Sequence, residues 1–410
     1  MRQPKIITTM QEYSWSLFRG DVLAGLTVAL VALPLSIAIA IASGATPADG
    51  LITAIIGGFF ISLLGGSRVQ IGGPTGAFIV VVYGVIADHG YDGLVLATLM
   101  AGVMLLIAGY FRLGRYIKYV PESVIEGFTI GIAIIIAMSE LSDALGLNVP
   151  HMPAEFFGKV EALWHARDTF ALQALGITAL TLLVIVALKK YAPRLPGLII
   201  AVTMASAAAL LAGLPIDTIA GRYGTLPSTL PVPHMPEISW PLLWTLLPSA
   251  LTIAFLAGIE SLLSAVVADR MMAGNHRPNA ELLAQGAGNM ASALCGGLPV
   301  TGAIARTATN VKAGGKTPVA GIVHALAILV IMMVLAETAS LMAMPALAAL
   351  LLYTAWNMSE PHKWKHYACL PKKELFVLVL TLLLTVTVDL TIAIAVGVAL
   401  GLILRLKRSA

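Results

Sequence analysis

Long apolar runs separated by short polar segments occupy most of this chain. A helix of about 20 apolar residues is long enough to cross the hydrocarbon core of a bilayer. The pattern therefore predicts an all-α polytopic membrane protein. Fourteen runs can be distinguished, several of them short or fused: residues 22–42, 48–64, 74–86, 93–111, 121–138, 172–188, 196–213, 243–268, 281–294, 301–311, 317–336, 340–356, 374–388 and 389–405.

The third and tenth runs are too short to cross a bilayer as helices. Residues 75–86 would form about 18 Å of helix, against a hydrocarbon core of roughly 30 Å. The tenth run is still shorter before it reaches Asn310 and Lys312. Each follows a Gly-Gly pair, in GGSRVQIGGPTGAF (65–78) and GGLPVTGAIARTAT (296–309). Because irregular backbone is tolerated at membrane depth where it lines a cavity, we predict a short extended segment and then a half-helix at both places, with the helix N-termini meeting near the midplane.

The chain divides into two similar halves. A segment rich in proline and glycine, residues 214–241, separates them. Residues 24–36 match residues 249–261 at five of thirteen positions, at a constant offset of 225. The short run stands third in each half. Seven spans per half would orient the halves oppositely in the membrane, so the pattern predicts inverted repeats.

Charge is sparse and lies mostly on one side of the predicted membrane. Hydrophobic residues make up 58% of the chain and charged residues 11%, with a formal net charge of +4. If the loops alternate from a cytoplasmic N-terminus, 21 of the 25 lysines and arginines are cytoplasmic, whereas Lys159, Arg167 and Arg222 lie outside and Arg306 lies within the membrane. The positive-inside rule then places both termini in the cytoplasm and supports an even number of spans. The basic excess reflects topology and not nucleic-acid binding.

No residue pattern in the sequence indicates an enzyme or a metal site. Walker loops, dinucleotide fingerprints and nucleophile–base motifs are absent. The two cysteines, Cys295 and Cys369, lack metal-ligand spacing, and the i,i+4 pair His362 and His366 has no nearby carboxylate. We therefore expect no catalytic residue, no metal and no cofactor other than a coupling ion.

The two predicted half-helices indicate an anion site. A helix N-terminus carries about half a positive charge and unpaired N–H groups, so two facing N-termini bind an anion without a side-chain cation. Residues 75–78 and 302–305 would supply these groups, and Thr75 and Thr301 would add hydroxyl donors. The alternative interpretation is that the small residues serve close helix packing.

Arg306 and Glu260 are charged side chains that lie well inside apolar runs. Arg306 costs roughly 2.5–3.5 kcal/mol at membrane depth on insertion scales, so we expect it to face a partner, a cavity or an anion. Its expected partner is Glu260, the only acidic residue within 243–268. A lone membrane carboxylate also serves as a proton acceptor or cation ligand. Ser264, on the same helical face, would complete a Na+ site or hydrogen-bond the protonated carboxyl. A coupling-ion role and a salt-bridge role both stay open for Glu260.

The chain resembles the sulfate permease (SulP) family along essentially its whole length. The resemblance implies fourteen transmembrane segments in two inverted repeats of seven, and a core domain that moves against a gate domain in an elevator-like motion. The most specific motifs are RGDVLAGLTVALVALPLSIAIAIASG (19–44), GGSRVQIGGPTGAFIVVV (65–82), GIESLLSAVVADRMMAGNHRPNAELLAQGAGN (258–289), TGAIARTATNVKAGGKTPVAGIVHAL (301–326) and ALLLYTAWNMSE (349–360).

The domain boundaries follow from this resemblance. After a cytoplasmic N-terminus of residues 1–20, the core domain would comprise residues 21–114 and 241–338, and the gate domain residues 115–240 and 339–410. The family usually carries a cytoplasmic STAS domain after the transport unit, and the 410 residues contain none. Either such a domain has been removed or the transport unit occurs alone.

The resemblance also implies which residues bind substrate. Arg306 corresponds to an arginine that is common at the start of the tenth helix. Glu260 occupies the acidic position of the eighth span, where a glutamate is similar to proton-coupled members and an aspartate to Na+-coupled bicarbonate transporters, so H+ symport is favoured. The substrate would lie between the third and tenth half-helices and against the first span, at Ile39, Thr75, Ala77, Phe78, Ala303, Ile304 and Ala305.

The implied function is secondary active anion transport by a homodimer in a bacterial inner membrane. The motifs GAIARTATN, AWNMSE and NHRPNAEL resemble a dicarboxylate-transporting branch that carries succinate, fumarate or aspartate. Many sulfate transporters of the family have Pro-Gln on the first span, where this chain has Pro34-Leu35. We therefore rank dicarboxylate before sulfate and bicarbonate. The alternatives are a passive anion channel, a Na+-coupled bicarbonate transporter and a nucleobase permease.

Overall fold

The computed structural model describes residues 3–119, 121–193, 195–388 and 390–409. It is mostly helical, with two strands of two residues each, β1 (Gly72–Gly73) and β2 (Thr301–Gly302). Its α-helices are α1 (Lys5–Thr9), α2 (Trp15–Ala42), α3 (Pro47–Ile52), α4 (Gly58–Leu64), α5 (Ile79–Tyr110), α6 (Glu122–Leu145), α7 (Phe156–His165), α8 (Leu172–Tyr191), α9 (Gly197–Leu211), α10 (Ile219–Tyr223), α11 (Trp240–Met272), α12 (Pro278–Leu294), α13 (Ile304–Lys312), α14 (Val319–Ala339), α15 (Met344–Met358), α16 (Trp364–Ala368), α17 (Lys372–Thr387) and α18 (Leu390–Ser409).

The apolar runs form membrane-length helices, which confirms the prediction of a polytopic helical membrane protein. Among the described residues, seven helices are long and apolar enough to cross a membrane. The count of fourteen spans and the inverted repeats stay predictions. The seven are Trp15–Ala42, Pro47–Leu64, Gly76–Tyr110, Glu122–Leu145, Leu172–Tyr191, Trp240–Met272 and Val319–Ala339.

Local sequence signals set several helix ends. Ser14 caps α2, because its side chain accepts a hydrogen bond from the Leu17 N–H at 3.3 Å. Gly146 ends α6 in the left-handed region, at φ 66°, where glycine has no Cβ penalty. Pro278 occupies the first position of α12, where the missing N–H costs nothing.

The third and fourth apolar runs form two helical parts of α5 that are separated at Gly90. The sequence predicts two segments, 74–86 and 93–111, and α5 runs through both. Gly90 lies between them with φ 69° and ψ −176°, far from helical values, so the helix axis breaks there. The half-helix is therefore the first part of α5, from its start to this break.

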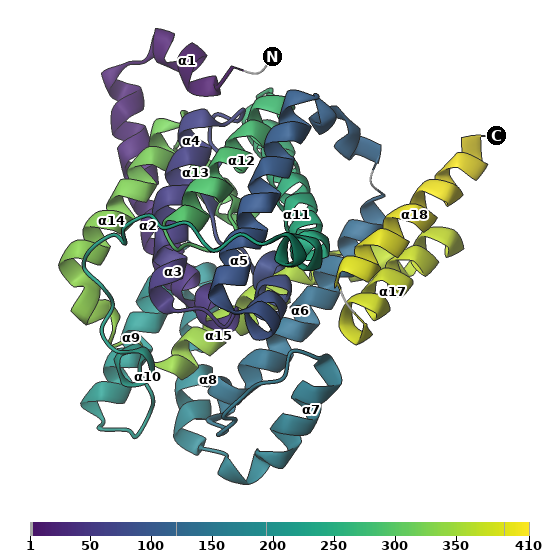
Figure 1. The fold of residues 1–410 in the computed structure, drawn as a ribbon. Coiled ribbons are helices and arrows are strands. Elements are labelled where there is room, and N and C mark those ends of the chain that lie inside the picture. The colour runs from purple at the N-terminus through teal and green to yellow at the C-terminus, as the bar shows by residue number, and fades with distance from the viewer. Residues whose placement is uncertain (1–2, 120, 194, 389, 410) are drawn as a thin grey trace.

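The helices pack in two groups. In the first, α12 and α11 pack against α5, α14 packs against α2, and α13 packs against α11 and α2. In the second, α17 and α15 pack against α6, α18 against α17, and α8 against α9. The groups meet where α15 and α9 contact α2 and where α6 contacts α5 (Figure 1).

Glycine allows the closest approach within the first group. A Cβ atom on Gly286 of α12 would lie 2.7 Å from the Gly102 carbonyl oxygen of α5. A Cβ atom on Gly102 would lie 2.6 Å from Cγ of Met290. Neither position has room for a side chain, so the α5 and α12 backbones pack directly on each other, as in many membrane helix pairs.

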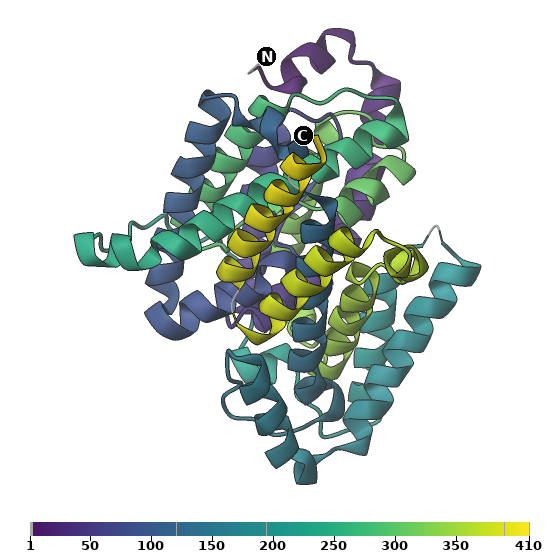
Figure 2. The ribbon, with the colours of Figure 1, turned by 90° about the vertical axis from the view of Figure 1, so that its right-hand side faces the viewer.

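Both chain ends lie toward the same end of the molecule. In Figures 1 and 2 the N-terminal helix α1 and the last turns of α18 lie toward the top, whereas α7 and α10 lie toward the bottom in Figure 1. We call this second end the α7 end. It is the end that the charge pattern predicts to be outside.

Candidate functional site

Two extended segments pair at the centre of the first helix group. Strands β1 and β2 are antiparallel, with Gly72 opposite Gly302 and Gly73 opposite Thr301. The Ala303 N–H extends the pairing by donating to the Ile71 carbonyl at 2.9 Å. Extended backbone at these two places was predicted from the short runs and is confirmed. The pairing joins segments that are more than 200 residues apart in the sequence.

A helix begins directly after each strand. After β1, a short 3₁₀ helix (Gly76–Phe78) leads into α5, and after β2, α13 begins at Ile304. Thr75 and Ala303 precede the two helices in extended conformation, and neither caps its helix through a side-chain hydrogen bond. The first N–H groups of both helices are therefore not taken up by capping side chains, which is the arrangement that binds anions at helix N-termini.

Glu260 of α11 lies beside the first of these helix starts. Its Oε2 accepts a hydrogen bond from the Thr75 hydroxyl at 2.8 Å, and its side chain is half-buried. One turn earlier on α11, the Ala257 carbonyl accepts from the Thr301 hydroxyl at 2.9 Å. Helix α11 thus contacts both half-helix connections, and it brings the Glu260 carboxylate to the residue before the third half-helix.

Ser264 lies on the same helix but has another partner. Its hydroxyl donates to Oγ1 of Thr307 at 3.1 Å, and this oxygen also accepts from the Ile71 N–H at 3.1 Å. The predicted contact with the Glu260 carboxyl is not formed, because one helical turn carries Ser264 toward α13. Ser264 therefore supports the strand pairing in this structure.

Arg306 is buried behind the strands, with 1% of its surface exposed. Its Nη2 donates to the Ser36 hydroxyl at 3.2 Å and to the Pro74 carbonyl at 3.1 Å. A Cβ atom on Gly73 would lie 2.0 Å from Nη1, so the guanidinium packs on the bare backbone of β1. The predicted ion pair with Glu260 is wrong. The arginine extends across β1 to α2, whereas the glutamate is held by Thr75.

The other predicted substrate residues divide by exposure. Ile304 and Ala305, at the start of α13, are exposed, and Ile304 has 38% of its surface accessible. The remaining predicted substrate residues are buried. They are Ile39 on α2, Thr75, Ala77 and Phe78 at the start of the third half-helix, and Thr301 and Ala303 just before α13. The tenth-helix start is therefore the accessible part of the predicted site in this conformation.

Sequence reasoning missed a polar stripe on α12 that holds the strand connections. Glu281 is fully buried and accepts hydrogen bonds from the Gly66 and Ser67 N–H groups at 2.9 and 3.1 Å. Asn289 binds both the carbonyl and the N–H of the residue before β2, and Gln285 links the two along the helix. A signal was present, because ELLAQGAGN (281–289) places three polar side chains at i, i+4 and i+8, on one helical face.

Asp21 is a second missed residue. It is fully buried near the start of α2. Its Oδ1 accepts from the N–H groups of Lys316 and Thr317 at 2.8 and 3.1 Å, and its Oδ2 accepts from the Thr317 hydroxyl at 2.5 Å. The carboxylate thereby ties α2 to the loop between α13 and α14.

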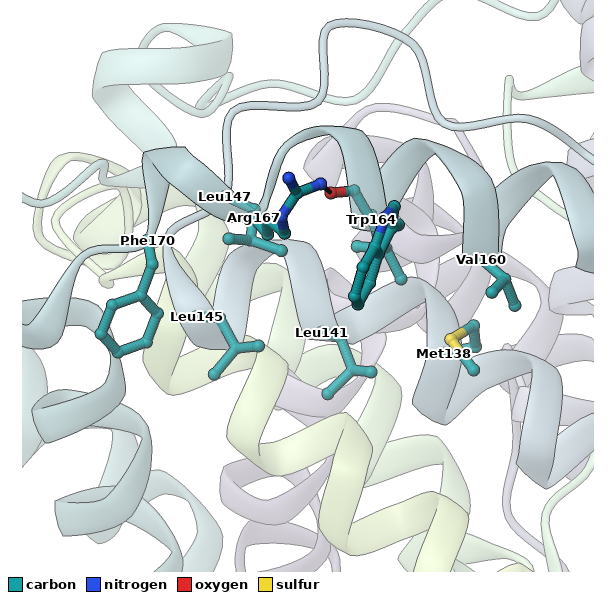
Figure 3. Close-up of a pocket in the computed structure, with 9 residues that line it drawn as sticks. Met138, Leu141, Leu145, Leu147, Val160, Trp164, Arg167 and Phe170 are labelled. Carbon is teal, nitrogen blue, oxygen red and sulfur yellow. Dashed lines mark hydrogen bonds between the residues drawn. The ribbon is translucent and has the colours of Figure 1, made fainter.

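An apolar cavity of about 340 Å³ lies outside this arrangement, between α6 and the α7 segment (Figure 3). Met138, Leu141 and Leu145 of α6 form one wall and Val160 and Trp164 of α7 another. Arg167 is the one charged residue in this otherwise apolar lining, and the cavity contains neither of the two half-helix starts. Within the described ranges, no three His, Cys, Asp or Glu side chains are grouped to hold a metal ion.

Comparison with known proteins gives consistent matches. Residues 18–381 match a family described as the sulfate permease family. The chain is 41% identical over 371 residues to YvdB of Bacillus subtilis (strain 168), named as a candidate sulfate transporter, and the match covers 90% of this chain and 70% of that protein. It is 32% identical over 345 residues to the bicarbonate transporter BicA of a Picosynechococcus species, and this match covers 81% of this chain and 60% of that protein. The solved transmembrane domain of a cyanobacterial bicarbonate transporter BicA matches with a TM-score of 0.82 and 28% identity, over 95% of this chain and 98% of that one.

Proposed function

The chain belongs to the sulfate permease family of membrane anion transporters, and we propose that it is a secondary active transporter of small anions. The observation that carries this proposal is the pairing of β1 with β2, which sets two uncapped helix N-termini at one centre beside a membrane carboxylate. Helix N-termini supply N–H donors and positive potential to an anion. A carboxylate at the same place supplies a group that carries a coupling proton.

The anion, we propose, binds between the starts of α5 and α13. Gly76, Ala77 and Ala305 are small, so their backbone N–H groups can approach an oxyanion closely. Arg306 lies one turn into α13 and contributes positive potential from behind β1. Its guanidinium is held by Ser36 and Pro74, so its role is to stabilise the anion at a distance and not to contact it.

Glu260 is the proposed coupling group, with H+ as the coupling ion. The Thr75 hydroxyl that bonds it belongs to the residue before the third half-helix, so proton uptake and anion binding share one neighbouring residue. The alternative coupling ion, Na+, needs several oxygen ligands. A proton needs only the Glu260 carboxyl itself, which the Thr75 hydroxyl already orients, so we propose H+.

For the transport step we propose fourteen segments in two inverted repeats, with the first helix group as a core domain that moves against the second as a gate domain. The anion would cross with the core, in an elevator-like motion. The assembly would be a homodimer in a bacterial inner membrane, with both termini in the cytoplasm. The chain ends lie toward the same end of the molecule (Figure 1), as this topology requires.

The proposed substrates are dicarboxylates such as fumarate and succinate, followed by sulfate and bicarbonate. The sequence motifs carry the first choice, and the names of the relatives YvdB and BicA support the second and third. Binding of fumarate, succinate, sulfate and bicarbonate to the purified protein, at several pH values with and without Na+, tests this directly. Absence of binding for all four would overturn the proposed function.

Transport in liposomes separates the proposed function from a passive channel. A pH gradient should drive accumulation of the bound anion above its equilibrium level, whereas a channel would only dissipate gradients. Glu260→Gln should abolish gradient-driven uptake and spare anion exchange, because the amide carries no exchangeable coupling proton. Glu337→Gln, which changes an exposed glutamate of α14, is the matched control. Unchanged pH dependence in the Glu260 variant would refute the coupling role.

A further inference from the structure

Lys159 is a buried lysine at the α7 end of the molecule. It lies on α7, in the polar segment between α6 and α8, and only 3% of its surface is exposed. Its Nζ lies 4.7 Å from the centre of the Tyr83 ring of α5. The cation–π contact therefore joins the second helix group to the first. Lysine is rarely buried unless its charge is paired, so this position needs a physical reason.

The charge of Lys159 has no close counter-ion. In the described part of the chain, no carboxylate forms an ion pair with it. Glu140 of α6 is the nearby carboxylate whose charge acts on the ammonium. Arg222, the other cation near this carboxylate, already has its own partners in Asp143 and Asp217, at 2.8 and 3.1 Å. Burial lowers the pKa of Lys159 to about 8, and Glu140 partly opposes this shift.

A small cavity lies beside Lys159, near the proposed anion site. Besides Lys159 and Tyr83, it is lined by the last residue of α2, by the first two residues of α5 and by Ser139 of α6. Ile79 and Val80 directly follow Phe78, and Ala42 lies one turn beyond Ile39 on α2. The cavity therefore lies one turn away from the predicted substrate residues, on the side of the α7 end. Its volume of about 10 Å³ holds about one water molecule.

We propose that Lys159 forms a second anion-binding site. This site binds a small carboxylate or inorganic oxyanion as the anion passes between the α7 end and the two helix N-termini. The ammonium is the one charged group on the cavity wall, and the other residues that line the cavity are apolar except for Tyr83 and Ser139. A buried cation without a close counter-ion favours a desolvated anion strongly. This inference rests on the proposed function for the identity of the ligand.

The present conformation closes this site. A carboxylate or sulfate group is larger than one water molecule, so the anion enters only when α7 moves away from Tyr83. The contacts that oppose this movement are the cation–π contact and the hydrogen bond that the Tyr83 hydroxyl donates to the Met152 carbonyl. The aromatic ring thus takes the place of the anion beside the ammonium while the site is closed.

Two measurements on the same proteoliposomes test the proposal. In vesicles with the α7 end outward, Lys159→Gln should raise the KM for external fumarate about tenfold, because a desolvated charge contact with the anion is lost. The maximal rate should stay close to wild type, and Lys159→Arg should restore part of the affinity. Arg167→Gln removes the same charge from an exposed position of the same segment and should leave KM unchanged.

The second measurement is acylation of Lys159 by a membrane-impermeant amine reagent, followed by mass spectrometry. Fumarate and sulfate should each slow acylation of Lys159, while acylation of exposed Lys190, measured in vesicles opened with detergent because this lysine lies on the opposite side, should be the same with and without either anion. Protection without any anion flux would support the site and refute the transporter assignment. Normal flux with an unchanged KM in Lys159→Gln and no protection would overturn the site and leave the transporter assignment intact.

Discussion

Glu281 provides a direct test of how the half-helix connections are held. Its Oε2 accepts from the Gly66 and Ser67 N–H groups, and its Oε1 accepts from the Ser261 hydroxyl at 3.0 Å and the Gln285 amide at 2.9 Å. Four donors face two oxygens, an arrangement that stabilises the carboxylate form of the group. We predict that Glu281→Gln destabilises the protein severely, although it changes only one heavy atom.

The magnitude follows from the number of donors that lose their acceptor. A glutamine side chain offers one carbonyl oxygen, so it accepts from one of the two pairs of donors only. Its NH₂ group then faces the other pair of donors. Hydrogen bonds to a charged group contribute about 1.5–3 kcal/mol each, so losing two costs roughly 3–6 kcal/mol. The backbone side is the better one for the remaining oxygen, because Gly66 and Ser67 cannot turn away.

The double variant Glu281→Gln/Gln285→Glu is the matched control. It keeps the composition and restores an acceptor opposite the new NH₂ group, so it should recover much of the loss. Thermal unfolding in detergent, followed by size-exclusion chromatography, measures both variants. We expect the single variant to unfold about 5 °C or more below wild type. A single variant as stable as wild type, or a double variant no better than the single one, would refute this account of the site.

Three further predictions concern the strands and the α7 end. Gly302→Ala should cost about 2 kcal/mol of stability, because its Cβ would lie 1.5 Å from the Gln70 amide nitrogen. Gly84→Ala is the control and should cost nothing, because the space around Gly84 is open. Thermal unfolding compares the two variants. Burial lowers the pKa of Lys159 from its ordinary value of 10.5 to about 8 in the folded state. Between these pH values the unfolded state binds more protons than the folded state, so the free energy of unfolding should rise with pH from about 8 to 10.5. Lys159→Gln should remove this rise in unfolding curves measured across that pH range. A rise that persists in the variant would show that another titrating group causes it. Tyr83→Phe keeps the ring and loses the hydroxyl, so acylation of Lys159 should become faster, and an unchanged rate would contradict the closing role of that hydroxyl.

The strand–helix breaks were predictable because they are defined by chain length. A run of twelve or fewer residues after Gly-Gly cannot span a bilayer, so both breaks follow from counting, and β1 and β2 lie where the count puts them. The separation of the third and fourth runs is confirmed, because α5 has non-helical dihedral angles at Gly90, which lies between them.

The partners across helices could not be predicted in the same way. Spacing along one helix gives the face on which a side chain lies, but the partner depends on how other helices are rotated. Arg306 and Glu260 were matched because each is the one ionic group in its run, yet backbone and hydroxyl groups hold both of them. The α12 stripe at 281, 285 and 289 could have been recognised from its period of four, because polar residues on one face of an apolar helix need buried partners.

The different ways in which the two charges are held give a physical reason for the proton coupling that we propose. Arg306 is ionised at neutral pH, and its contacts with Ser36 and Pro74 hold it behind β1. Glu260 has a single hydroxyl partner, Thr75, so either protonation state can be accommodated. When Glu260 is protonated, the arginine and both helix N-termini present net positive potential to an anion. When it is ionised, its charge offsets that of the arginine and opposes the anion. In the mechanism that we propose, one site therefore takes up the anion and the proton together, and no direct Arg306–Glu260 contact is needed.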